Sequence, residues 1–101
     1  AAAMSRFQAV ERDLAFLVPA DFLARTFEEE VKQADREGLV RRVSVVDLYT
    51  GQGVPEGMKS LAFSLVIQAQ DRTLTDAEVE AFSQAVVGRM TEKHGAALRG
   101  G

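Results

Sequence analysis

The fold is decided by Ser44-Val-Val-Asp-Leu-Tyr-Thr-Gly51, by Lys59-Ser-Leu-Ala-Phe63 and by Arg72-Thr-Leu-Thr75, three segments that follow one another closely. The first two predict strands, over residues 40–49 and 59–70, joined by a glycine-rich loop. In the second strand apolar residues alternate with small or polar ones, which is typical of an antiparallel sheet with one covered and one open face. The third segment predicts a turn into a helix.

The first of these strands changes its apolar phase once. Val43 and Val45 alternate with polar residues, and the alternation then continues one position out of step, at Val46 and Leu48. A one-residue change of phase predicts a β-bulge at these positions. If Leu48 faces the core beyond the bulge, Asp47 and Tyr49 face the opposite side of the sheet.

Shorter signals define the elements on either side. Residues 13–18 are an apolar run that ends at Pro19, which predicts a strand. Residues 21–37 predict a helix with Asp21 as its N-cap and Gly38 at its end. The buried stripe of this helix has residues at helical spacing, namely Leu23, Phe27, Val31 and Ala34.

A second helix is predicted from a capping box, Thr75-Asp-Ala-Glu78, to the exit signal His94-Gly95. Its buried stripe consists of Val79, Phe82, Val86 and Met90. Residues 96–98 predict a brief last strand, either at an edge or paired with the first strand. The order β-α-β-β-α-β predicts an α+β fold of the ferredoxin-like, split βαβ type, with a four-stranded antiparallel sheet and two helices on one face.

Composition limits what the chain can do. Its 101 residues include no cysteine, which excludes disulfides, thiolate metal sites and thiol nucleophiles. No apolar run approaches the roughly 20 residues of a membrane helix, and no signal peptide is visible. We therefore predict a cytoplasmic protein without a membrane partner. Residues 1–5 are predicted to be a vector remnant, and residues 6–101 to be one domain.

The charge distribution bears on any nucleic-acid partner. The net charge is −3, which opposes binding to a polyanion. The acids gather in the two predicted helices, and the remaining residues carry a slight basic excess. If the helices face away from the ligand, this distribution weakens contact with nucleic acid without forbidding it.

Patterns for catalysis or phosphate binding are weak. The loop 51–60 resembles a phosphate loop, but a strand follows it where a phosphate loop needs a helix, so we interpret it as a hairpin loop. His94 has no serine, cysteine or metal-ligand partner at a useful spacing, which favours a surface or helix-capping residue. Asp13 and Asp47 could be a carboxylate pair, but Asp47 beside Tyr49 is better explained as a hydrogen-bond acceptor at a strand end.

Tyr49 is the only tyrosine and allows two interpretations. It could pack partly on its own loop, or it could be a platform on which a nucleobase stacks. Stacking of a base on an aromatic ring contributes roughly 1–3 kcal/mol. Four basic residues at strand ends or in loops are either solvated or close to phosphate: Arg12, Lys59, Arg72 and Arg99.

Taken together, five blocks resemble the ferredoxin-fold anticodon-binding domain, the C-terminal (B8) module of the β subunit of bacterial phenylalanyl-tRNA synthetase. The resemblance runs from about residue 7 to residue 100. The blocks are Arg12-Asp-Leu-Ala15, Asp47-Leu-Tyr-x-Gly51, Lys59-Ser-Leu-Ala62, Arg72-Thr-Leu-Thr-Asp76 and Ala97-Leu-Arg99. One departure is that the family often has a proline ahead of its Arg-Asp, where this chain has Gln8-Ala-Val-Glu11.

The resemblance implies a module that binds the anticodon stem-loop of phenylalanine tRNA. It implies that Tyr49 stacks on the first anticodon base and that Asp47 hydrogen-bonds a base edge, with Ser60 and Ala62 lining the same side. Candidate phosphate contacts under the same resemblance are Arg12, Lys59 and Arg72. No catalytic residue, metal or cofactor is implied for this domain. The longer synthetase would use ATP and magnesium and would pair with an α subunit in an α2β2 assembly.

Two other functions are alternatives to RNA binding. An acylphosphatase of similar fold needs an arginine in its glycine-rich loop and an asparagine that orients water, and this chain contains no asparagine. A regulatory or self-association domain without RNA binding is the other alternative. A large exposed apolar patch around Leu17 and Val66 on the open face would favour it.

Overall fold

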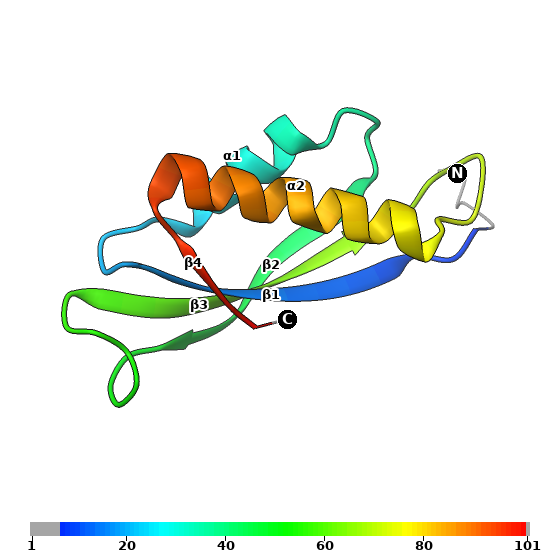
Figure 1. Cartoon of the computed structure of the whole chain (residues 1–101). Helices are drawn as coiled ribbons and strands as arrows, with labels where there is room; N and C mark the ends of the chain where they lie inside the picture. The colour runs from blue at the N-terminus through cyan, green and yellow to red at the C-terminus, as the bar shows by residue number, and fades with distance from the viewer. Residues whose placement is uncertain (1–6, 101) are drawn as a thin grey trace.

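The computed structural model describes residues 7–100 and confirms the predicted order of elements (Figure 1). One sheet has the strand order β2-β3-β1-β4, and each neighbouring pair is antiparallel. Both helices lie on the same side of this sheet. The predicted vector remnant, residues 1–5, lies outside the described residues. The elements are β1 (Val10–Pro19), α1 (Ala24–Ala34), β2 (Val40–Tyr49), β3 (Met58–Ile67), α2 (Asp76–His94) and β4 (Ala97–Gly100).

The hydrophobic core lies between the sheet and the two helices. Phe63 of β3 stacks on Phe27 of α1, with ring centroids 3.8 Å apart and ring planes 8° from parallel. Both rings are fully buried. The predicted alternation of β3 is confirmed, because every second side chain is buried under the helices, namely Leu61, Phe63, Leu65 and Ile67.

The start of α1 differs from the prediction. The helix begins at Ala24 rather than directly after Asp21, and its N-cap, Leu23, makes no side-chain capping hydrogen bond. The chain turns first, and the Phe22 N–H donates to the Pro19 carbonyl at 3.0 Å. This turn buries Phe22 and leaves Leu23 50% exposed. The prediction that Leu23 belongs to the buried stripe is therefore wrong.

The end of α1 comes at Ala34, before the predicted end at Glu37. The carboxylate of Asp35 accepts hydrogen bonds from the backbone N–H groups of Leu39, at 2.8 Å, and Val40, at 3.0 Å. These bonds stabilise a turn in place of another helical turn. They lead the chain directly into β2.

The predicted limits of α2 are confirmed. Thr75 and Glu78 form the complete capping box, and Gly95 closes the helix in the left-handed conformation, at φ 62°. The buried stripe of Val79, Phe82, Val86 and Met90 faces the sheet. Within residues 7–100, no helix combines the length and the apolar character needed to cross a membrane.

Glu30 of α1 joins the two helices. Its side chain is 12% exposed and accepts hydrogen bonds from Arg89 Nε at 2.9 Å and His94 Nε2 at 2.8 Å. Burial by itself raises the pKa of Glu30, but the hydrogen bonds from His94 and Arg89 outweigh it, so the pKa lies below its usual value. His94, interpreted from sequence as a surface or capping residue, is a partner in this helix–helix contact.

Replacing Glu30 with glutamine is expected to lower the free energy of unfolding by about 1–3 kcal/mol at neutral pH. The pKa of the carboxyl is lower in the folded state, so its contribution is fully present above the unfolded value of 4.5 and is lost as the pH falls through the folded value. Urea unfolding of both proteins from neutral pH down to about pH 3 should show the difference shrinking. A difference that is independent of pH would contradict this account of Glu30.

Candidate nucleic-acid interface

A bulge in β2 decides which side chains reach the face of the sheet that the helices leave uncovered. The register shifts after the residue opposite Phe63: the next pair joins Asp47 to Ala62, and Val46 is left over. Without this extra residue, Val46 would take the place of Asp47 on the open face. The predicted bulge is confirmed, and Asp47 and Tyr49 lie on the side away from the helices.

Tyr49 stands at the end of β2 with 41% of its surface exposed. Its hydroxyl donates to the Gln52 carbonyl at 2.8 Å, in the loop that follows the strand. Gly51 lies close to this hydroxyl, since an added Cβ would come within 3.6 Å of it, and its φ of +123° is one that other residues rarely adopt. The loop therefore holds the tip of the side chain, and the ring remains on the uncovered side of the sheet.

A shallow depression of about 400 Å³ lies beside the Tyr49 ring. Tyr49 pairs with Ser60, and Ala62 pairs with both Asp47 and Ala15. With Arg99 of β4, all four strands contribute to the depression. The residues that line it are Ala15, Asp47, Tyr49, Ser60, Ala62 and Arg99. Four of the sequence-predicted site residues thus come together: Asp47, Tyr49, Ser60 and Ala62.

The chemistry of this depression suits a flat ring with polar edges. Small side chains leave room on its floor, and the Tyr49 ring offers a face on which such a group can stack. The Asp47 carboxylate is exposed and can accept hydrogen bonds from N–H groups at the edge of a ring. The Ser60 hydroxyl can donate or accept at a second position.

Arg99 is a residue of this depression that sequence reasoning did not assign to the site. Its Cζ lies over the Tyr49 ring, 5.9 Å from the centroid. The short strand β4 carries it there, because β4 pairs with β1 at Ala15, Phe16 and Leu17. The sequence contained two signals for this position, the predicted last strand beside the first and the Ala97-Leu-Arg99 block. It does not show how far a long arginine side chain extends across the sheet.

Lys59 and Arg12 lie elsewhere. Lys59 pairs with the buried Val18, so it points to the helix side of the sheet, and its Nζ donates to the Phe22 carbonyl at 2.7 Å. Arg12 pairs with the buried Leu65 and donates to a neighbouring backbone carbonyl at 3.1 Å. Neither residue joins Tyr49, and their predicted phosphate contacts stay predictions without support from their positions.

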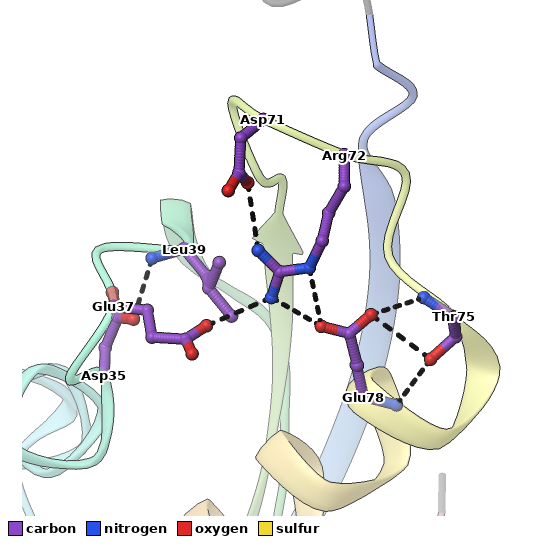
Figure 2. Close-up of polar contacts among 7 residues, drawn as sticks. All are labelled: Asp35, Glu37, Leu39, Asp71, Arg72, Thr75 and Glu78. Atoms are coloured by element: carbon purple, nitrogen blue, oxygen red, sulfur yellow. Dashed lines mark hydrogen bonds and ion pairs between the residues drawn. The ribbon is translucent and has the colours of Figure 1, made fainter.

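Arg72 lies at the opposite end of the sheet, in the loop between β3 and α2 (Figure 1). Figure 2 shows its guanidinium between three carboxylates: Glu78, Asp71 at 2.9 Å and Glu37 at 3.3 Å. The hydrogen bonds to Glu78 and then to Glu37 raise the pKa of Arg72, and the bond from Arg72 lowers the pKa of Glu78. This network stabilises the start of α2. The predicted phosphate contact of Arg72 therefore also stays a prediction.

The half of the open face away from Tyr49 carries two acids, Glu11 and Asp13, and one base, Arg42. Ser64 Oγ donates to Glu11 Oε2 at 2.7 Å, and Asp13 pairs with the same Ser64. The strand β3 separates Asp13 from Asp47, which puts about 10 Å between their strands and rules out the carboxylate pair. Among residues 7–100, no group of three or more His, Cys, Asp or Glu side chains is placed to hold a metal ion.

These features define a class of domain: a split βαβ sandwich whose uncovered sheet face carries an accessible aromatic ring beside polar and cationic groups. Comparison with known families agrees with this architecture. The family model of the ferredoxin-fold anticodon binding domain matches residues 5–99, and the chain belongs to that family.

The relatives are subunits of one kind of enzyme. The chain is 49% identical over 96 residues to the phenylalanine–tRNA ligase beta subunit of Moorella thermoacetica and 50% identical over 96 residues to that of Salinibacter ruber. It is 45% identical over 95 residues to that of a Synechococcus species. These alignments cover 94–95% of this chain and 11–12% of the relatives, so the chain spans only a small part of their length.

Proposed function

We propose that this domain binds the anticodon stem-loop of phenylalanine tRNA on the open face of its sheet. The observation that carries the proposal is the position of Tyr49, whose ring lies on the uncovered side next to a depression with polar edges. Sequence-specific readers of RNA bind unpaired loop bases by stacking them on such rings. The family membership supports the anticodon as the target, and the relatives' names support phenylalanine tRNA.

Each residue of the depression has a role in this proposal. The first anticodon base stacks on Tyr49, which contributes roughly 1–3 kcal/mol. Asp47 accepts a hydrogen bond from an N–H group of the base, and Ser60 bonds a second edge atom. Ala62 has a side chain small enough for the base to approach the sheet.

The rest of the proposal concerns the longer protein. We infer that this domain serves in the cytoplasm as an appended part of a phenylalanine–tRNA ligase β subunit, which supports attachment of phenylalanine to tRNA. The α subunit, ATP and magnesium act in other parts of that α2β2 assembly. A tethered module can work with weak intrinsic affinity, because tethering raises its effective concentration. This agrees with the net charge of −3.

The test is a titration of this chain with RNA hairpins at two salt concentrations. One hairpin carries the anticodon loop of phenylalanine tRNA, and the control has the same stem with a different first anticodon base. We expect the first hairpin to bind at least about tenfold more tightly, as loss of one base contact predicts, and the ratio to persist at the higher salt. Equal binding of both hairpins, with affinity that falls steeply in salt, would mean charge attraction alone.

The self-association alternative receives less support. Leu17 and Val66, the centre of the apolar patch that would favour it, are both partly buried and are not among the exposed large apolar side chains. Exposed apolar side chains of the sheet lie instead on its two edge strands, at Val45, Val46 and Leu48 of β2 and at Leu98 of β4. Leu48 pairs with the buried Leu61 on the helix side and is exposed because no strand lies beyond β2.

A further inference from the structure

The Arg99 guanidinium lies over the Tyr49 ring rather than against an acidic side chain. Arg72 contacts three carboxylates and Arg89 contacts Glu30. Among residues 7–100, no ion pair forms at Arg99, although the carboxylate of Asp47 lines the same depression. The Arg99 side chain is instead directed at the Tyr49 ring, so its planar cation is available to a ligand.

The distance between the Arg99 guanidinium and the Tyr49 ring indicates how a flat ligand could fit between them. Stacked planar groups are separated by about 3.5 Å, so two planes with a flat ring between them lie about 7 Å apart. The Arg99 Cζ is 5.9 Å from the Tyr49 centroid. A movement of roughly 1 Å would thus admit a base between the guanidinium and the phenol ring.

The surroundings of Arg99 permit this movement. Arg99 is exposed and lies near the end of a four-residue edge strand, next to a register irregularity at Ala15 and Phe16. Gly53, in the loop between β2 and β3, lies next to Arg99, since a Cβ added to Gly53 would be 3.9 Å from Arg99 Nη2. Because glycine has no side chain, that space stays open to the guanidinium.

We propose that Arg99 and Tyr49 form a clamp for one unpaired nucleobase, with the guanidinium on one face of the base and the phenol ring on the other. Guanidinium planes and aromatic rings are the two surfaces on which proteins stack unpaired bases. The inference rests on the proposed function and adds to it a specificity-determining residue. In this clamp Arg99 acts through its plane on the base rather than through its charge on a phosphate.

Arg99→Lys tests the clamp, because lysine keeps the charge and loses the plane. The matched control is Arg42→Lys, since Arg42 is exposed on the same open face at the far end, opposite Val66. Each variant and the unaltered chain are titrated with the phenylalanine anticodon hairpin and with the same hairpin made abasic at the first anticodon position. Thermal melting of each protein checks that the fold is intact.

We expect Arg99→Lys to weaken binding of the intact hairpin about tenfold and to leave binding of the abasic hairpin unchanged. Arg42→Lys should change neither by more than about twofold. Unchanged binding of the intact hairpin, or equal weakening for both hairpins, would overturn the clamp. If the unaltered chain binds both hairpins equally or binds neither, the proposed function itself fails, and the clamp fails with it.

Discussion

Replacing Phe27 with alanine is expected to lower the free energy of unfolding by about 3–5 kcal/mol. Phe27 is fully buried, stacks on Phe63 at 3.8 Å and lies 5.9 Å from the Phe16 ring, so truncation removes contacts of α1 with two strands of the sheet. A domain of this size has roughly 5–15 kcal/mol of total stability, so the loss is a large part of it. Equilibrium unfolding in urea, followed by circular dichroism, measures the change.

The matched control for this prediction is Leu23→Ala. Leu23 precedes α1 and is half exposed, although its spacing in the sequence placed it in the same buried stripe as Phe27. We expect a loss below about 1 kcal/mol for this substitution. Comparable losses for the two substitutions would mean that α1 presents a different face to the sheet.

Replacing Tyr49 with alanine is expected to weaken binding of the anticodon hairpin by about tenfold to a hundredfold. The substitution removes the stacking surface and one wall of the depression. The melting temperature should change little, because the ring is substantially exposed and makes one hydrogen bond, to its own loop. Isothermal titration and thermal melting of the same protein separate the two effects.

Tyr49→Phe is the control for this second prediction. It keeps the ring and loses the hydroxyl that donates to the Gln52 carbonyl. We expect it to retain most of the affinity. A large loss of stability in Tyr49→Ala with unchanged RNA binding would instead show that the ring is only a structural support for its loop.

The parts of the site that sequence could predict depend on local chain geometry. The change of apolar phase at Val45 and Val46 was sufficient to predict the bulge. The bulge in turn put Asp47 and Tyr49 on the face opposite the core. Strand periodicity fixes the side on which each residue lies, since successive side chains alternate between faces. The same periodicity placed Ser60 and Ala62 beside them.

The parts that sequence could not predict depend on long side chains and on competing turns. Lys59 and Arg72 resembled phosphate contacts, but their flexible side chains reach partners that only the tertiary fold brings close: the Phe22 carbonyl and a group of carboxylates. Arg99 was not predicted to belong to the site, but the fold brings it to Tyr49, which lies on a strand distant in the sequence. Asp21 resembled an N-cap, but the preceding turn delayed the start of α1.

The distribution of charge across the fold agrees with the location of the site. Glu30, Glu37 and Glu78 are all engaged on the helix side or at the far end of the sheet. Glu11 and Asp13 occupy the half of the open face away from Tyr49, where Arg42 is the one base, so that half carries a net negative charge. The site end of that face has Arg99 with a single carboxylate, Asp47. An RNA loop would therefore meet the least repulsion at Tyr49, although the whole chain is acidic.

The most direct test of the central claim is to locate the hairpin on the protein in the proposed titration. Backbone amide chemical shifts of isotope-labelled protein report which residues the RNA approaches. The account predicts that the shifts cluster in residues 47–53, 60–62, 15–17 and 97–99, while the outer faces of α1 and α2 are unaffected. Shifts confined to the helices, or to the loop around Arg72, would contradict the claim that the open face at Tyr49 binds RNA.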